Sequence, residues 1–363
     1  LPSNAVELIV AIIALIDNQV TVVQTSLVGS VLSNLLLVLG LCFLAGGFNR
    51  PEQYFNTTVA QTAASLLALA VASLIVPTIF SHTPDLYNDD NVFSLPPGAV
   101  PQLSHGVSII LLLIYALFLF FQLKTHSQVF NEASQKVAKK AIFKTWSGLP
   151  ENAIASGVAR AGVTCANLRD ENGGVGDGMQ APSPHSEDKD ESEEPTLHLF
   201  VALATLTIST VIIALCAEGL VSGIEPISSV VSEEFIGLIL ILIVGNACEH
   251  ATAVTVSIKD KMDLAIGVAI GSSMQVALFL IPLLVIIGWG LGNEEMTLAF
   301  DTFQVVSLFV AVLLVNYLIS DGKSHWLEGV QLIALYVIIA ICAFFYPNST
   351  DVAAAEPTAA RLL

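Results

Sequence analysis

A succession of long apolar runs constrains the fold of this chain more than any other feature. Each of eight runs is close to the length of about 20 residues that a helix needs to cross roughly 30 Å of hydrocarbon. Charged residues make up 12% of the chain, whereas a soluble domain has about 25%. A transmembrane barrel would show segments of about 10 residues with alternating polarity, and none is visible. The sequence therefore predicts an all-α polytopic membrane protein.

The same runs predict how many times the chain crosses the membrane. A first run, 5–16, is too short to span a bilayer alone, so we expect a chain that is truncated at its amino terminus. This gives about nine spans, of which the first is partial. The eight whole spans are expected at approximately 22–44, 58–80, 107–123, 197–220, 235–258, 264–289, 303–319 and 327–346.

The segment 124–195 interrupts this pattern and is predicted to lie outside the membrane. Its part 131–145 contains four lysines and is expected to form a basic helix at the membrane surface. An acidic tract near the end of the loop has two readings: a solvated linker, or a weak site that collects or senses divalent cations. The acids of this tract are Glu187, Asp188, Asp190, Glu191, Glu193 and Glu194.

The basic residues indicate which side of the membrane this loop occupies. If 124–195 is cytosolic, the alternation of spans places twelve of the thirteen Lys and Arg residues on the cytosolic side, as membrane proteins prefer. The opposite loops carry acids such as Asp17, Glu234 and Asp301, with no Lys or Arg. The net charge of −18 argues against nucleic-acid binding and suits a protein that handles cations.

An acid inside an apolar run points to the functional site. Glu249 lies within 235–258, where an ionised side chain costs roughly 3 kcal/mol or more. The sequence Asn246-Ala247-Cys248-Glu249 has a counterpart, Asn4-Ala5-Val6-Glu7, in the first run. The same offset of 242 residues relates Gly29-Ser30 to Gly271-Ser272 in the spans that follow. The chain therefore contains an internal repeat.

This repeat predicts two halves that cross the membrane in opposite directions. Five crossings separate the two motifs, and an odd number reverses the direction of the chain. Inverted repeats with a polar site near the midplane are typical of secondary transporters. We expect an incomplete first repeat over 1–123, a cytosolic loop over 124–195, a second repeat of five spans over 196–346 and a tail over 347–363.

The spacing of polar residues indicates which groups converge. Asn and Glu at i and i+3 share a helix face, so each motif presents an amide oxygen and a carboxylate together. In the following spans Ser30, Ser33 and Asn34 share a face, as do Ser272 and Gln275. Two carboxylates among neutral oxygens suit Ca²⁺, or Mn²⁺. When the cation leaves, both acids cannot stay ionised at low cost, which couples cation release to proton uptake.

Three of these residues also have a structural interpretation. Asn4 and Asn246 are suited to cap broken helices, and capping is compatible with binding a cation. His250 is expected either to pack against other side chains or line the lumen, or else to bind the cation.

Four further residues are expected to act in packing or at the membrane interface. Gly29 and Gly271 are suited to close helix contact. Glu218 and Glu328 lie near span ends, where reaching the interface is the simplest expectation.

The stretches 3–16, 29–47, 245–279 and 324–330 together resemble the calcium/proton exchangers of the cation/Ca²⁺ exchanger superfamily, particularly the fungal vacuolar type. The resemblance implies a vacuolar membrane protein that uses the proton gradient to drive Ca²⁺ out of the cytosol, without a resident cofactor. It implies that Glu7 and Glu249 bind cation and protons alternately, and that His250 matches a histidine of the family. The residues that complete the site by this resemblance are Asn4, Asn246, Ser30, Ser272 and Gln275.

The sequence therefore predicts a secondary active antiporter rather than an enzyme, with the lipid bilayer, Ca²⁺ and H⁺ as its partners. The carboxylate pair alone leaves open a Mn²⁺/H⁺ or Na⁺/Ca²⁺ exchanger of the same architecture, and also a cation channel. A metal-dependent hydrolase that uses Glu249 and His250 would need further ligands, and no HExxH motif is present.

Overall fold

The computed structural model describes residues 2–48, 50–82, 96, 98–131 and 231–347, with scattered positions between 201 and 223. The chain divides into two compact units, and the fold described below belongs to the unit formed by 1–140 and 209–363. Five of its helices are long and apolar enough to cross a membrane, and two shorter apolar helices accompany them. The predicted spans confirmed as long helices are 22–44, 58–80, 107–123, 264–289 and 327–346.

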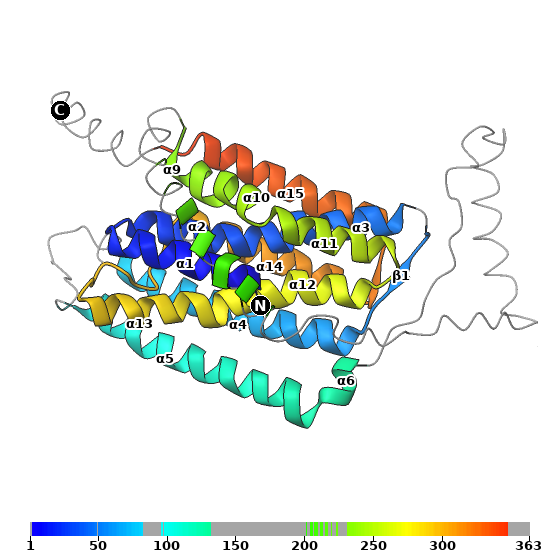
Figure 1. Cartoon of the computed structure of the whole chain (residues 1–363), viewed down its shortest axis with the longest axis horizontal. Coiled ribbons are helices and arrows are strands. Elements are labelled where there is room, and N and C mark those ends of the chain that lie inside the picture. The colour runs from blue at the N-terminus through cyan, green and yellow to red at the C-terminus, as the bar shows by residue number, and fades with distance from the viewer. Residues whose placement is uncertain are drawn as a thin grey trace, which may run out of the picture. The chain divides into compact units, whose positions relative to one another are not determined.

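The first part of the chain forms helices joined by short turns (Figure 1). Its second helix continues without interruption from Val20 to Gly47, and 83% of its most apolar window is buried inside the protein. The elements in order are α1 (Pro2–Ile16), α2 (Val20–Leu32), the π-helical segment η1 (Ser33–Val38), α3 (Leu39–Gly47), β1 (Gln53–Tyr54), α4 (Thr57–His82), α5 (Ala99–Phe120), the π-helical segment η3 (Phe121–Thr125) and α6 (Ser127–Asn131).

The second part is likewise built of helices joined by short turns. Its elements are α9 (Glu233–Phe235), the π-helical segment η5 (Ile236–Leu240), α10 (Ile241–Gly245), α11 (Ala247–Ile258), α12 (Met262–Gln275), the π-helical segment η6 (Val276–Leu280), α13 (Ile281–Leu291), α14 (Thr302–Leu318), β2 (Lys323–Ser324) and α15 (Trp326–Phe344).

Two predicted spans differ from the structure, and a third stays a prediction. The run 235–258 is not one helix, because Asn246 adopts φ −101° and ψ 10° between α10 and α11. The span expected at 107–123 begins earlier, at Ala99, because Gly98 with φ 77° turns the chain into the helix. Most of 197–220 lies outside the described residues, so the total of nine spans stays a prediction.

The internal repeat extends well beyond the residues that are identical in the two copies. α1 ends at Ile16 and α11 at Ile258, and α2 begins at Val20 and α12 at Met262, each pair 242 residues apart. The turns between them contain Asn18 (φ 59°) and Asp260 (φ 63°), again 242 apart. Both residue types tolerate this left-handed conformation. The same offset relates the last five residues of η1 to η6.

The two repeats run in opposite directions, as the sequence predicts. In Figure 1, α2 continues into α3 toward the end of the bundle that holds β1, whereas α12 continues into α13 away from it. Val31 and Ser273 are equivalent positions, and Ser273 Oγ lies 3.5 Å from the carbonyl oxygen of Val31. A two-fold rotation exchanges equivalent positions, so two of them can touch only near the axis. The axis that relates the repeats therefore passes between these two residues.

Basic residues gather at one end of the bundle, beside the antiparallel pair β1–β2. Arg50 Nε lies 3.5 Å from Asp260 Oδ1 in a buried ion pair, and Lys323 Nζ lies 3.4 Å from Glu52 in an exposed one. Every Lys and Arg of the described ranges lies in an element or turn at this end: Arg50, Lys124, Lys259, Lys261 and Lys323. This arrangement agrees with the predicted separation of basic and acidic loops.

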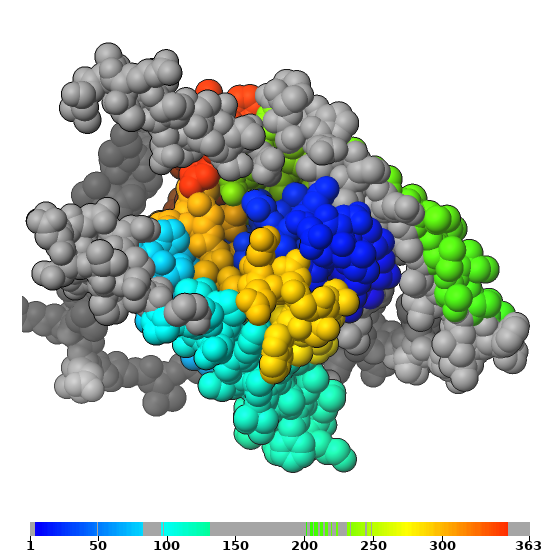
Figure 2. Space-filling model, turned by 90° about the vertical axis from the view of Figure 1, so that its left-hand side faces the viewer, coloured from blue at the N-terminus to red at the C-terminus, as the bar shows by residue number. Residues whose placement is uncertain are grey.

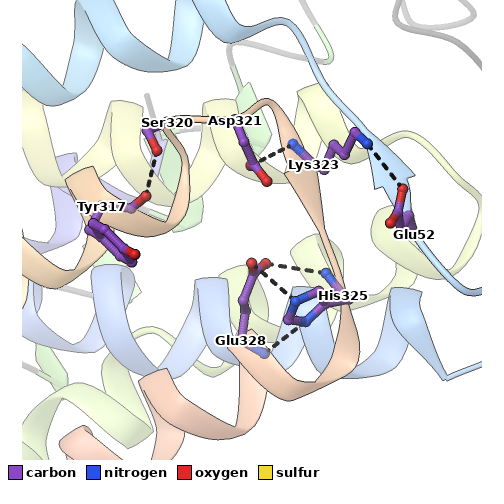
Figure 3. A network of polar contacts seen from close by, with 7 residues as sticks. All are labelled: Glu52, Tyr317, Ser320, Asp321, Lys323, His325 and Glu328. Atoms are coloured by element: carbon purple, nitrogen blue, oxygen red, sulfur yellow. Dashed lines mark hydrogen bonds and ion pairs between the residues drawn. The ribbon is translucent and has the colours of Figure 1, made fainter. Parts of the chain in front are cut away.

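Glu328 begins α15 at this same end, where its side chain pairs with His325 (Figure 3). Its backbone N–H donates to His325 Nδ1 at 3.3 Å, and its carboxylate accepts from the backbone N–H of His325 at 3.2 Å. This reciprocal capping box leaves Glu328 only 8% exposed. Glu218, which is expected with Glu328 to reach the membrane interface, lies outside the described residues.

Candidate functional site

The break at Asn246 positions the first functional side chain. Asparagine is well suited to the first position of a helix, and Asn246 occupies that position in α11. Its side chain makes no capping hydrogen bond there. The amide Nδ2 donates instead to Oε1 of Glu7, 3.1 Å away in the other repeat. The helix break therefore turns this side chain toward the acid of α1.

Glu7 is held by donors from both repeats. Ser30 of α2 donates its hydroxyl to Glu7 Oε1 at 2.6 Å, and Asn246 donates to the same oxygen. Ser30 is fully buried and Asn246 is 3% exposed. A carboxylate that accepts two hydrogen bonds on one oxygen has its second oxygen available for another group. That second oxygen, Oε2, is buried and has no hydrogen-bond partner among the described residues.

A second set of hydrogen bonds surrounds Asn4, one turn before Glu7. Ser272 of α12 donates its hydroxyl to Asn4 Oδ1 at 2.9 Å, and Asn34 donates its amide to Ser272 at 3.3 Å. Asn4 and Asn34 are both almost completely buried. This set links α1, η1 and α12 in the same way that the first set links α1, α2 and the start of α11.

The acid of the second repeat lies near this network with fewer contacts. Glu249 is half-buried in the first turn of α11, and its Oε2 also has no hydrogen-bond partner among the described residues. Glu249 and Glu7 are close enough to interact electrostatically. His250 is half-buried beside it, with its Nε2 3.3 Å from the hydroxyl of Ser33.

The structure thus brings together most of the predicted site residues and leaves some apart. Asn4, Glu7, Ser30, Asn246 and Ser272 share hydrogen bonds. Gln275 ends α12 half-buried, and no hydrogen bond within the described part of the chain connects it to them. The acidic tract, Glu187 to Glu194, lies outside the described residues.

Two residues that the predicted site omitted also take part. Ser33 contacts His250, and Asn34 contacts Ser272. Their spacing from Ser30 by three and four positions places all three on one face of the helix. That spacing was the available signal, but it does not indicate which residue of the other repeat each side chain meets.

The chemistry of this centre is that of hard oxygen ligands. Two carboxylates each present a buried oxygen without a hydrogen-bond partner in the described structure, and neutral amide and hydroxyl groups lie around Glu7 and Asn4. Within the described ranges, no group of three or more His, Cys, Asp and Glu side chains is arranged to hold a metal ion. Two carboxylates with neutral oxygens suit a cation such as Ca²⁺ that is bound and released.

A cavity of about 440 Å³ lies elsewhere, between α4 and α14. Its walls are mostly apolar side chains, such as Ile75 and Phe309, and they include none of the predicted site residues. We assign it no part in the site because it offers almost no ligating groups.

Comparison with known proteins places these observations in a family. The family model described as sodium/calcium exchanger protein matches residues 1–124 and 201–345. The vacuolar calcium ion transporter of Schizosaccharomyces pombe is 41% identical over 348 residues, which are 95% of this chain and 70% of that protein. The vacuolar calcium ion transporter of Cryptococcus neoformans var. grubii is 42% identical over an alignment 381 residues long, which covers 96% of this chain and 62% of that protein.

A solved structure agrees with the sequence relatives. The crystal structure of a selenium-substituted Ca²⁺/H⁺ antiporter protein, YfkE, is 30% identical, with a TM-score of 0.65, and the match covers 95% of this chain and 83% of that one. The family match covers both repeats and both acid-bearing motifs. The chain belongs to the sodium/calcium exchanger protein family.

Proposed function

We propose that this protein is a secondary active antiporter that exchanges cytosolic Ca²⁺ for vacuolar H⁺. The observation that carries the proposal is the pair of repeat-related acids, Glu7 and Glu249, each with a buried oxygen that no described group satisfies. In a bilayer such an oxygen is expensive unless a cation or a proton occupies it. The names of the related proteins, vacuolar calcium ion transporter and Ca²⁺/H⁺ antiporter, support these two ions as the substrates.

The two acids would bind the ions in alternation. With Ca²⁺ present, both carboxylates are ionised and share the charge of the cation, while neutral oxygens complete its coordination. When Ca²⁺ leaves, two neighbouring negative charges in a medium of low dielectric constant are unfavourable, so protons take its place. We propose that the neutral ligands come from Asn4, Asn246, Ser30, Ser272 and Gln275, with His250 beside them.

Alternating access is the mechanism that the inverted repeats favour. Each repeat carries one acid, and Asn246 of the second repeat donates to Glu7 of the first, so movement of one repeat against the other would change which side reaches the acids. The π-helical segments η1 and η6 occupy equivalent places directly after the polar residues of α2 and α12. Such segments interrupt regular hydrogen bonding and are frequent at functional sites.

The arrangement in the membrane follows from the charges. We propose that the basic end of the bundle and the loop 124–195 face the cytosol, with repeats over 1–123 and 196–346 and a tail over 347–363. The protein would then lie in the vacuolar membrane and deliver Ca²⁺ into the vacuole. The acidic tract 187–194 would act on the cytosolic side, and its deletion should change the Ca²⁺ dependence of transport without abolishing it.

Transport into reconstituted vesicles tests the proposal. We expect Ca²⁺ uptake that requires an imposed pH gradient and is lost in Glu7→Gln and in Glu249→Gln. Glu295→Gln, a change of the same kind at an exposed position in the loop before α14, serves as the control and should transport normally. Uptake that persists without the pH gradient, or in both acid variants, contradicts the mechanism.

The same vesicles separate the rival functions. Uptake driven by a Na⁺ gradient would identify a Na⁺/Ca²⁺ exchanger, and a preference for Mn²⁺ over Ca²⁺ under a pH gradient would identify a Mn²⁺/H⁺ exchanger. A cation channel would pass Ca²⁺ down its own gradient with no movement of protons.

A further inference from the structure

A second group of oxygen-bearing side chains lies at the end of the bundle opposite the basic residues. Glu234 of α9, Asp301 and Gln304 at the start of α14, and Tyr346 after α15 converge there. Figure 2 views this end and shows the start of α14 beside the end of α15. None of these residues belongs to the centre formed by Glu7 and Glu249.

Gln304 hydrogen-bonds to Glu234 and has one polar atom without a partner in the described part of the chain. Its amide nitrogen, Nε2, lies 3.0 Å from both carboxylate oxygens of Glu234 and 3.1 Å from the hydroxyl of Thr25. Thr25 in turn donates to the carbonyl oxygen of Thr21, which fixes the orientation of the Gln304 amide. The oxygen of the same amide, Oε1, is buried and has no hydrogen-bond partner in the described part of the chain. Gln304 as a whole is 2% exposed.

A purely structural role does not account for this oxygen. Asp301 is the N-cap of α14 and accepts from the backbone N–H of Phe303 at 2.7 Å. Gln304 follows at the position from which a capping box would return a bond to the Asp301 backbone. That reciprocal bond is not made, because the amide is directed to Glu234 instead. A buried polar atom left without a partner usually marks a place for an ion or water.

The charges at this end favour a cation. Tyr346 donates to Asp301, with its hydroxyl 3.0 Å from each carboxylate oxygen. Glu234 and Asp301 thus place two carboxylates among the side chains that meet here. Within the described ranges, every Lys and Arg lies at the other end of the bundle.

We propose that Glu234, Asp301 and Gln304 form an outer binding site for a divalent cation at the non-basic end of the bundle. Its ligands are two carboxylates and the amide oxygen Oε1, with the Tyr346 hydroxyl at its edge. This set of hard oxygens selects Ca²⁺ or Mn²⁺ over softer metals. The site does not depend on the proposed transport function, because it is built from residues outside the central pair.

Binding of Tb³⁺, a luminescent substitute for Ca²⁺, tests the site in the purified chain. Glu7→Gln and Glu249→Gln are introduced together so that the central acids do not contribute. Tb³⁺ emission that is excited through tyrosine reports an ion close to a phenol ring. We expect a saturable signal that Ca²⁺ displaces and that Tyr346→Phe removes.

Two charge-removing variants then measure the contribution of the carboxylates. Glu234→Gln and Asp301→Ser should each weaken Tb³⁺ binding by about tenfold or more, and serine retains an N-cap acceptor for α14. Glu294→Gln and Glu295→Gln change exposed acids of the same end and should leave binding unchanged.

Gln304→Leu replaces the buried amide by an apolar side chain of similar size, so it tests the amide even if a carboxylate variant fails to fold. We expect it, too, to weaken binding by about tenfold. The proposal is overturned if folded Glu234→Gln, Asp301→Ser or Gln304→Leu protein binds Tb³⁺ as tightly as the parent, or if Glu294→Gln abolishes the signal.

Discussion

The side-chain amide of Asn246 lies 3.1 Å from the carboxylate of Glu7, although 239 residues separate them in the chain. Each residue belongs to a motif of its own repeat, so the acid of one repeat is completed by the amide of the other. Among the described residues the symmetric hydrogen bond, between Asn4 and Glu249, is not made, and Asn4 Oδ1 accepts from the hydroxyl of Ser272. The two halves of the centre are thus related in position and unequal in bonding.

Asn246→Ala should weaken Ca²⁺ transport by lowering apparent affinity. The substitution removes one of the two donors to Glu7, and a hydrogen bond to a charged group contributes about 1.5–3 kcal/mol, equivalent to roughly tenfold or more in affinity. The Ca²⁺ concentration dependence of uptake measures it. Asn316→Ala is the matched control, since Asn316 donates only to the carbonyl oxygen of Val312 within α14. Equal effects of both substitutions would argue against a specific role for Asn246.

Gly29→Ala should destabilise the protein, whereas Gly271→Ala at the equivalent position should not. A Cβ at Gly29 would lie 2.7 Å from both the Cα and the carbonyl oxygen of Leu238, so backbone must move. Such overpacking costs about 1–3 kcal/mol. Nothing described lies within 4 Å of a Cβ at Gly271, where alanine gains up to about 1 kcal/mol in helix propensity. Unfolding in detergent compares the two, and similar midpoints would contradict the expected packing of α2 on η5.

Asp260→Asn should destabilise the protein strongly because it removes the negative charge of a buried ion pair with Arg50. The side chains of this pair are only 5% and 9% exposed, and breaking a buried pair typically costs about 3–5 kcal/mol. Asparagine tolerates the left-handed conformation at this position, so backbone strain is not added. Glu52→Gln is the control, because its pair with Lys323 is 45% exposed on both sides. Equal unfolding midpoints for the two variants would show that the buried pair contributes little.

Tyr346 should lose its proton only near pH 12 in the folded protein. Its folded pKa lies above the ordinary value of 10, so the folded state holds the phenolic proton more tightly than the unfolded chain does. The resulting stabilisation is present below pH 10 and is lost as the pH rises toward 12. Phenolate absorbance, measured as the difference from Tyr346→Phe, follows the titration. Asp301→Ser should bring the pKa down toward 10, and an unchanged titration there would exclude Asp301 as a cause.

Much of the architecture could be predicted because the membrane imposes a length on apolar helices. Five predicted spans are long helices in the structure. The offset that relates Glu7 to Glu249 also relates Asn18 to Asp260 and η1 to η6. The repeat was identified from a few polar residues, and it also holds for turns and helix ends because the two copies have the same backbone conformation there.

Other features could not be predicted because they depend on contacts distant in sequence. The sequence indicated that Asn246 is suited to cap a broken helix, but not that its side chain would leave the cap and donate to Glu7. Gln275 shares a face with Ser272, yet within the described part of the chain Ser272 alone of the two hydrogen-bonds to the other repeat. Gln304 looks like an ordinary residue of a first helical turn, and its relation to Glu234 appears only once α9 is placed beside α14.

Val31 and Ser273 lie where the pseudo-two-fold axis passes through the protein, and this has a consequence for how such a chain can change. Elsewhere the two copies occupy separate spaces, so each can vary without regard to the other. At the axis the two copies of one position share a single space, and a larger side chain in one copy must be met by a smaller one in the other. Val31 opposite Ser273 is such an unequal pair. A perfectly symmetric dimer of half-chains could not hold two different residues there, whereas a fused chain can.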